Sequence, residues 1–109
     1  MNPAPETPKK TATESSLALP GLASALSHVT RWKMLKELSG GEARSIEELA
    51  QAGGCRYENA LKHLAILRAA GLVVQGRGRL YQIPPKHLTS PGEPVVDYGH
   101  CLLRLHAVE

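Results

Sequence analysis

Hydrophobic residues recur every three or four positions between residues 17 and 71, which is the spacing of amphipathic helices. In the clearest segment, 55–71, the apolar face consists of Ala60, Leu64 and Leu67. The other side is polar and positively charged and carries Arg56, Asn59 and Lys62. A helix with one apolar and one basic face can pack on a core and enter the major groove of DNA. We therefore predict a recognition helix over residues 56–71.

Two shorter helices are predicted near the start of the chain. The first includes Pro20, which suits a first helical turn, and its apolar face is Leu22, Ala25 and Leu26. The second spans residues 30–38 and ends before Gly40 and Gly41. Its apolar stripe is Trp32, Leu35 and Leu38, with Met34 beside it. Its solvent-facing residues are expected to be Arg31, Lys33, Lys36 and Glu37.

A third helix is predicted over residues 45–52, where Ser45 and Glu48 have the spacing of a capping box. Its buried face consists of Ile46, Leu49 and Ala50. Gly53 and Gly54 then allow a tight turn into the recognition helix. A short capped helix, a glycine turn and a second amphipathic helix form a helix-turn-helix.

Two short β runs follow this motif, at residues 72–75 and 80–83. They are separated by Gly-Arg-Gly-Arg at 76–79, which favours a hairpin. The order of elements predicts a winged helix-turn-helix over residues 17–83. The fold class is mainly α with a small β-hairpin wing (α+β).

The flanking segments differ in composition from this domain. Residues 1–16 are rich in Pro, Thr and Ser and are predicted to be a disordered tail. Residues 84–94 contain four prolines and are predicted to be an extended linker. Residues 95–109 are apolar again, and a strand is favoured there over a helix. So long an apolar end needs a partner surface, so we predict an extra C-terminal strand at the interface of a homodimer.

Composition and charge restrict the class of protein. The 109 residues fit one small domain, and its core must be aliphatic because there is no Phe and only one Trp. The sequence contains no apolar run long enough for a membrane span and no secretory signal, which predicts a cytoplasmic protein without membrane contacts. Between residues 56 and 86, six basic residues stand against the single acid Glu58, which suits a phosphate-facing surface.

Candidate chemistry outside this surface is sparse. Cys55 and Cys101 match no metal or redox spacing, although Cys55 precedes a helix N-terminus and a redox role stays open. Possible ligand types gather near the C-terminus: Asp97, His100, Cys101, His106 and Glu109. These residues either bind a metal ion or are ordinary side chains of an interface, and the second interpretation is favoured. We predict no cofactor and no enzymatic activity, since no catalytic arrangement is apparent.

Three motifs resemble ArsR-type winged-helix regulators. They are LSHVTRWKMLKEL, SIEELAQAGGCRYENALKHLAILRAAGLV and GRGRLYQI, and the resemblance covers residues 22–83. It implies a dimeric transcription factor whose second motif helix enters the major groove while the wing at 76–79 flanks it. By the same resemblance, the DNA-binding residues are Arg56, Tyr57, Asn59, Lys62, His63, Arg77 and Arg79.

The sequence departs from that family at two informative places. Leu61 stands where a small polar residue usually faces DNA; it weakens hydrogen-bond readout but can contact a thymine methyl group. The metal-sensing thiolates of the family have no counterpart in residues 42–46. Two functions therefore follow as hypotheses. The favoured one is a DNA-binding transcriptional regulator, expected to be a repressor; the alternative is a winged-helix module that binds a protein through Leu61 and residues 95–108.

Overall fold

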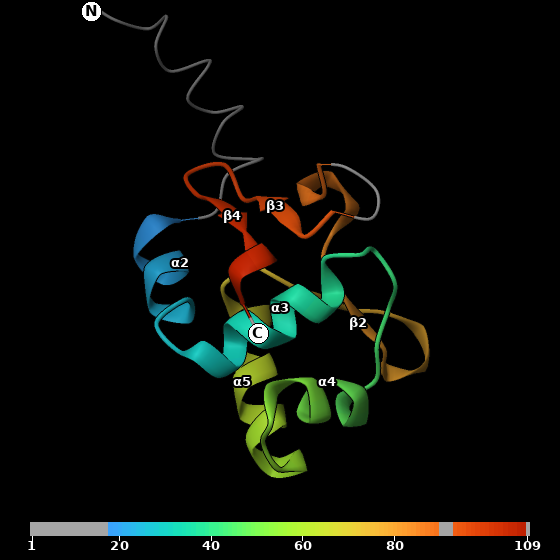
Figure 1. Cartoon of the computed structure of the whole chain (residues 1–109). Helices are drawn as coiled ribbons and strands as arrows, with labels where there is room; N and C mark the ends of the chain where they lie inside the picture. Colours follow the sequence, from blue (N-terminus) through green and yellow to red (C-terminus); the bar gives the residue numbers. More distant parts are fainter. Residues whose placement is uncertain (1–17, 90–92, 109) are drawn as a thin grey trace, which may run out of the picture.

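Four helices and two small hairpins make up the computed structural model, which describes residues 18–89 and 93–108. The helices are α2 (Leu19–Ala25), α3 (Val29–Leu38), α4 (Ile46–Gly53) and α5 (Tyr57–Ala69). The first hairpin pairs β1 (Val74–Gln75) with β2 (Tyr81–Gln82), and the second pairs β3 (Val95–Asp97) with β4 (Leu102–Arg104). The β3–β4 hairpin lies at one end of the molecule, and the α4–α5 turn lies at the other (Figure 1). The predicted disordered tail lies outside the described residues.

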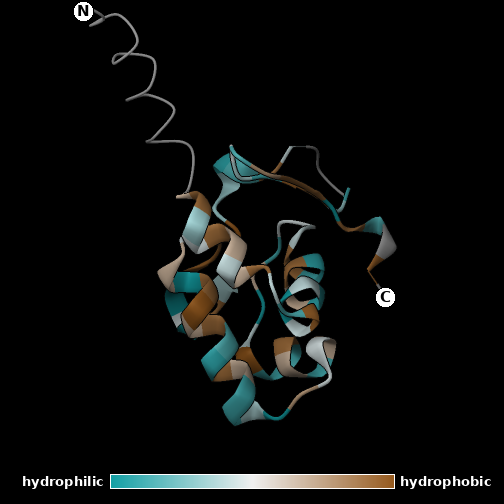
Figure 2. Cartoon of the chain, turned by 90° about the vertical axis from the view of Figure 1, so that its left-hand side faces the viewer, coloured by the Kyte–Doolittle hydropathy of each residue, from teal (hydrophilic) through white to brown (hydrophobic). Residues whose placement is uncertain are grey.

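The core is aliphatic, as the composition predicts. In Figure 2, hydrophilic and hydrophobic bands alternate along the helices, and the apolar residues of each meet in one cluster. The predicted faces of α4 and α5 are confirmed, since Leu49, Leu64 and Leu67 are fully buried. None of the helices in the described part of the chain is long and apolar enough to cross a membrane.

The capping box of α4 is confirmed in full. The Glu48 amide donates to Ser45 Oγ at 3.1 Å, and the Ser45 amide donates to Glu48 Oε1 at 2.8 Å. The backbone hydrogen bond from Ser45 holds the pKa of Glu48 below its usual value. These two bonds satisfy donors that the start of a helix leaves open, so the sequence fixes where α4 begins.

The stripe predicted for α3 is wrong at one position. Met34, Leu35 and Leu38 are buried, whereas Trp32 is 41% exposed and its indole Nε1 donates to the Leu26 carbonyl at 2.6 Å. Trp32 therefore closes the α2–α3 turn instead of filling the core. The charged residues of α3 are half-buried, not fully solvent-facing, because other elements pack beside them. They are Arg31, Lys33, Lys36 and Glu37.

Gly53 packs closely against side chains of α3. A Cβ atom there would lie 2.9 Å from Thr30 Cγ2 and 3.4 Å from Met34 Cε. Thr30 is β-branched and cannot easily turn away. We expect Gly53→Ala to lower the free energy of unfolding by about 1–3 kcal/mol through overpacking, measured by urea denaturation. Gly21→Ala in α2 is the matched control, since nothing lies within 4 Å of the added atom; an equal loss in both variants would contradict the contact.

The predicted wing hairpin is confirmed, with shorter strands. Val74 pairs with Gln82 and Gln75 with Tyr81, while Leu72 and Val73 are buried in the core before the ladder begins. Arg44, in the loop before α4, adds a β-bridge to Tyr81, with backbone N–O distances of 2.8 Å in both directions. The hairpin is therefore anchored to the loop that leads into α4, an arrangement compatible with a winged-helix-like α+β fold.

The strand favoured over a helix for residues 95–109 is confirmed in part, as two short strands, Val95–Asp97 and Leu102–Arg104, instead of one. Gly99, with φ of +96°, turns the chain back, and its amide donates to Asp97 Oδ1 at 2.9 Å. Val96, Tyr98 and Leu105 are buried within their own chain. These three buried residues need no second subunit to cover them, whereas Leu102 on β4 is 48% exposed. The homodimer remains a prediction.

Residues 84–89 are not the extended linker that the prolines predicted. Pro85–His87 forms a 3-10 turn, and Leu88 bridges to Val96. His87 is 2% exposed, packs on the Tyr98 ring and hydrogen-bonds the Asp97 carbonyl through Nδ1 at 3.1 Å. The segment is held by the β3–β4 hairpin because its apolar and aromatic atoms are covered there. The rest of the predicted linker includes residues 90–92, which lie outside the described residues.

Candidate nucleic-acid interface

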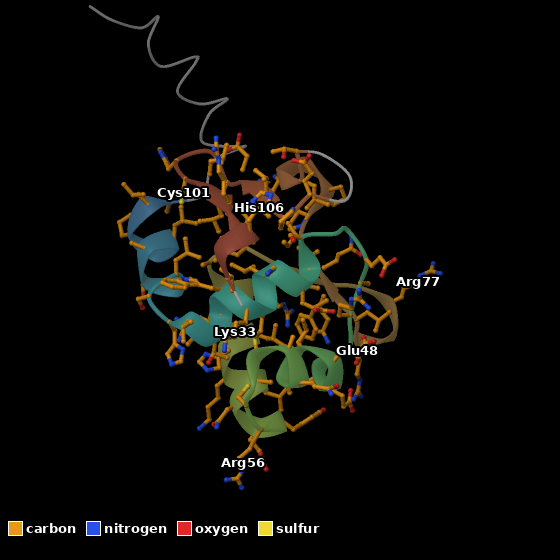
Figure 3. The ribbon with its side chains drawn as sticks, in the orientation of Figure 1. Lys33, Glu48, Arg56, Arg77, Cys101 and His106 are labelled. Atoms are coloured by element: carbon orange, nitrogen blue, oxygen red, sulfur yellow. The ribbon has the colours of Figure 1, made fainter. Side chains whose placement is uncertain are left out.

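The turn between α4 and α5 brings the start of α5 to the surface. Gly54 adopts the left-handed conformation with φ of +70°, and the Cys55 amide donates to the Ala50 carbonyl at 3.0 Å. Arg56 is the N-cap residue of α5 in an extended conformation, and its side chain makes no capping bond. Figure 3 shows Arg56 pointing away from the molecule at this end. A glycine pair in the sequence thus becomes a sharp turn that exposes the first turns of α5.

Four of the predicted contact residues are exposed on those first turns: Arg56, Tyr57, Asn59 and Lys62. The opposite face of α5 is buried, because Ala60, Leu64 and Leu67 contact the core. Glu58, the only acid in α5, is exposed among the basic residues. The structure therefore exposes all four side chains on the first turns of α5, although the helical period puts Tyr57 and Asn59 on different sides of the helix.

His63, the fifth predicted contact on α5, is half-buried and faces α3. Arg31 Nε donates to His63 Nδ1 at 3.1 Å, and the His28 ring centroid lies 4.6 Å from that of His63. Since Nδ1 accepts this bond, the proton of the neutral imidazole resides on Nε2. Burial chiefly, and then the positive charges of His28 and Arg31, lower the pKa of His63. His63 thus joins α5 to α3 and is separate from the exposed group.

This pairing predicts a loss of stability in mild acid. Because the pKa of His63 is lower in the folded chain, the unfolded chain binds the proton first, and the unfolding free energy falls with pH below about 6.5. Burial chiefly lowers the pKa of His87 as well, so this residue also makes the unfolding free energy fall in acid. Urea titrations from about pH 7.5 to pH 5 measure the decline. His63→Gln should make it shallower; an unchanged slope in that variant would contradict the assignment.

The wing places the other two predicted contacts at its tip. The turn Arg77–Arg79 links β1 to β2, and residues 76–80 are all exposed. The Gly76 amide donates to the Leu80 carbonyl at 2.7 Å and closes the turn. Arg77 points outward in Figure 3. The two arginines are thus held on a short, closed loop.

Arg79 has a strained backbone. Gly78 and Arg79 have φ of +67° and +61°, and Arg79 is the one non-glycine residue with positive φ in the part of the chain that the structure describes. A left-handed conformation costs an ordinary side chain roughly 1 kcal/mol or more, and glycine or asparagine avoids most of that cost. Strain of this kind points to a role for the side chain outside the fold.

One exposed side-chain hydrogen bond joins the wing to α5. Arg68 Nη1, in the last turn of α5, donates to Gln75 Oε1 on β1 at 3.2 Å. Arg68 belongs to the basic segment 56–86, but no sequence pattern indicates that it pairs with Gln75, seven residues further along and beyond a turn. The contact orients one side of α5 toward the wing.

Arg44 is the centre of an ion-pair group that the sequence did not predict. It lies 3.3 Å from Glu37, 3.1 Å from Glu42 and 3.9 Å from Glu48. The Glu48 pair has the i, i+4 spacing that favours such contacts, which is the only sequence signal for the group. The carboxylates of Glu37, Glu42 and Glu48 neutralise the charge of Arg44, so this arginine is not available to bind phosphate.

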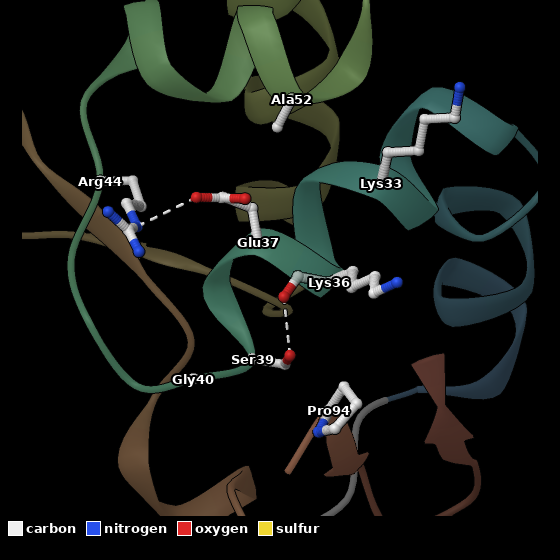
Figure 4. A pocket seen from close by; sticks show the side chains of 8 residues that line it. All are labelled: Lys33, Lys36, Glu37, Ser39, Gly40, Arg44, Ala52 and Pro94. Atoms are coloured by element: carbon white, nitrogen blue, oxygen red, sulfur yellow. Dashed lines mark hydrogen bonds and ion pairs between the residues drawn. The ribbon is translucent and has the colours of Figure 1, made fainter. Parts of the chain in front are cut away.

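A cavity of about 500 Å³ lies beside this group, between α3, the loop before α4 and Pro94 (Figure 4). Lys33, Lys36 and Glu37 line it from α3, and Ser39 donates to the Lys36 carbonyl at 2.7 Å. The lining residues include none of the seven predicted DNA contacts. The cavity is therefore separate from the candidate interface.

Of the C-terminal ligand types, Glu109 lies outside the described residues, and the others form no metal centre in the part of the chain that the structure describes. No group of three or more His, Cys, Asp or Glu side chains there could hold a metal ion. Cys101 and His106 lie at the end of the molecule opposite Arg56 (Figure 3). Cys55 is a free thiol, half-buried against the core.

Comparisons with models of known protein families, with curated proteins and with solved structures give no match.

Proposed function

We propose that this chain is a winged helix-turn-helix transcriptional regulator that binds double-stranded DNA. The first turns of α5 enter the major groove, and the wing contacts the flanking backbone or minor groove. The observation that carries the proposal is the pairing of two exposed basic features on one core, the start of α5 and the Arg77–Arg79 tip. The ArsR-like motifs suggest in addition a homodimer that represses transcription.

The charge of the two features supports this proposal. Arg56, Lys62, Arg77 and Arg79 are exposed, and no ion pair involving them occurs among the described residues. Unpaired arginine and lysine side chains release counterions from DNA when they contact phosphates, which makes affinity fall with salt. The strain at Arg79 adds weight, because glycine would suit the turn better if the fold alone decided the residue.

A protein-binding module is the second candidate, and one observation favours it. Tyr57, Leu61 and Ile66 on α5 are 45%, 39% and 40% exposed. Neighbouring apolar side chains that are exposed together, such as Tyr57 and Leu61 one turn apart, are typical of protein interfaces. DNA is preferred because a protein partner gives no reason for two arginines at the tip of a strained wing.

Selection of bound sequences from a pool of random duplexes, using the purified full chain, tests the proposal. We expect enrichment of a defined sequence, and an inverted repeat if the chain acts as a homodimer. A pool that stays random, together with no salt-dependent retention of DNA, would favour the protein-binding module.

A further inference from the structure

A row of apolar side chains is exposed on the helix that carries the proposed DNA contacts. Tyr57 is 45% exposed and Leu61 is 39% exposed, and Ala65, one further turn along α5, is exposed as well. The i, i+4, i+8 spacing places the three side chains along one side of the helix. They are not the residues by which α5 fills the core.

The row runs along the side of α5 that faces the wing. Arg68 follows Leu61 by seven residues, which is two helical turns, so both lie on the same side of α5. Arg68 reaches Gln75 on β1 with a hydrogen bond of 3.2 Å. The apolar row therefore lies on the side of α5 from which Arg68 reaches β1, which is the side that a duplex bound by both α5 and the wing would face.

The surroundings of the row fit a polyanion better than a protein. Arg56 and Lys62 are exposed beside it on α5, and Arg77 and Arg79 are exposed on the wing. The only acid of the helix is Glu58. An apolar strip bordered by cations matches the major groove, in which phosphates flank the base edges.

Thymine supplies the apolar group of that groove. Its C5 methyl projects from the base edge, and the other three bases present only hydrogen-bonding groups and ring atoms there. We propose that Tyr57, Leu61 and Ala65 read thymine methyl groups, so that the bound sequence has thymine at fixed positions in each α5 contact. The proposal rests on the proposed DNA binding and adds the chemical class of bases that α5 selects.

Exchange of thymine for uracil tests the proposal, because it removes the methyl group and keeps every hydrogen-bonding group of the base. The probe is the duplex enriched from the random pool, synthesised once with thymine and once with uracil at the enriched thymine positions. We expect the uracil duplex to bind the full chain roughly fourfold more weakly for each contacted methyl group. The slope of affinity against salt should be the same for both duplexes, since the phosphate contacts do not change.

Two variants assign the effect to the row. Leu61→Ala should lower the thymine-to-uracil ratio roughly fourfold, the share of one methyl contact, while the salt slope stays as in the original chain. Lys62→Ala, at the next position, is the matched control; it should weaken binding to both duplexes equally and lower the salt slope by about one. Both side chains are exposed, so neither change removes a core contact.

The outcomes separate this proposal from DNA binding itself. Equal affinity for the two duplexes, an enriched sequence without thymine, or a Leu61→Ala variant that keeps the full ratio would overturn methyl reading and leave DNA binding in place. Absence of salt-dependent binding to any duplex would overturn both. In that case the row would instead be expected to bind a protein.

Discussion

Replacing Arg77 and Arg79 together by alanine is expected to weaken DNA binding roughly 30-fold, taking about 1 kcal/mol for each phosphate contact. The slope of log affinity against log salt should fall by about two, one for each lost contact. Both side chains are exposed and unpaired with any described acid, so the free energy of unfolding should change little. Fluorescence anisotropy of a labelled duplex over a series of salt concentrations measures both quantities.

Arg104→Ala is the matched control for the wing. Arg104 is exposed on β4, at the end of the molecule away from α5, and its loss should leave affinity and salt slope unchanged. Arg79→Gly gives a second check, because it removes both charge and strain: the chain should become more stable by about 1 kcal/mol while DNA binding weakens. Equal effects of the wing and Arg104 substitutions would contradict a wing contact.

Tyr98→Ala is expected to lower the free energy of unfolding by about 3–5 kcal/mol, as for other large side chains removed from a core. Tyr98 is fully buried, and its hydroxyl donates to the Leu72 carbonyl at 2.9 Å. Burial raises the pKa of this phenol above its ordinary value, so it donates as a neutral hydroxyl. The residue therefore joins the C-terminal hairpin to the segment that leads into the wing. Urea denaturation followed by circular dichroism measures the loss.

Tyr98→Phe keeps the prediction testable if the alanine variant does not fold. It retains the ring and removes only the hydroxyl, which leaves the Leu72 carbonyl without its donor and should cost about 1–3 kcal/mol. DNA binding of the phenylalanine variant should be unchanged at low temperature. A loss below about 1 kcal/mol in Tyr98→Ala would mean that the hairpin is not part of the core.

Local patterns predicted the part of the fold on which the candidate interface depends. The 3.6-residue period located α4 and α5, the Ser45–Glu48 pair located the start of α4, and the two glycines at 76 and 78 located the wing turn. The exposure of Arg56, Tyr57, Asn59 and Lys62 followed from the same period, since Ala60, Leu64 and Leu67 occupy the opposite face. Each of these features is decided within a few residues of the chain.

Contacts between distant residues were beyond the sequence patterns. The bond from Arg31 to His63 spans 32 positions and the bond from Tyr98 to Leu72 spans 26, and neither has a local signal. The apolar composition of residues 95–108 correctly indicated that part of this segment is buried. It did not indicate which surface covers the segment. A dimer interface was predicted there, and the chain itself covers Val96, Tyr98 and Leu105 while Leu102 is 48% exposed.

An NMR titration of the full chain with duplex DNA, followed through the backbone amides, tests the location of the interface most directly. We expect the largest shifts at residues 56–62 and 76–80, and small shifts at 95–105, at the end of the molecule opposite the α4–α5 turn (Figure 1). Shifts confined to the C-terminal hairpin or to the cavity beside Arg44, or no shifts at low salt, would contradict it.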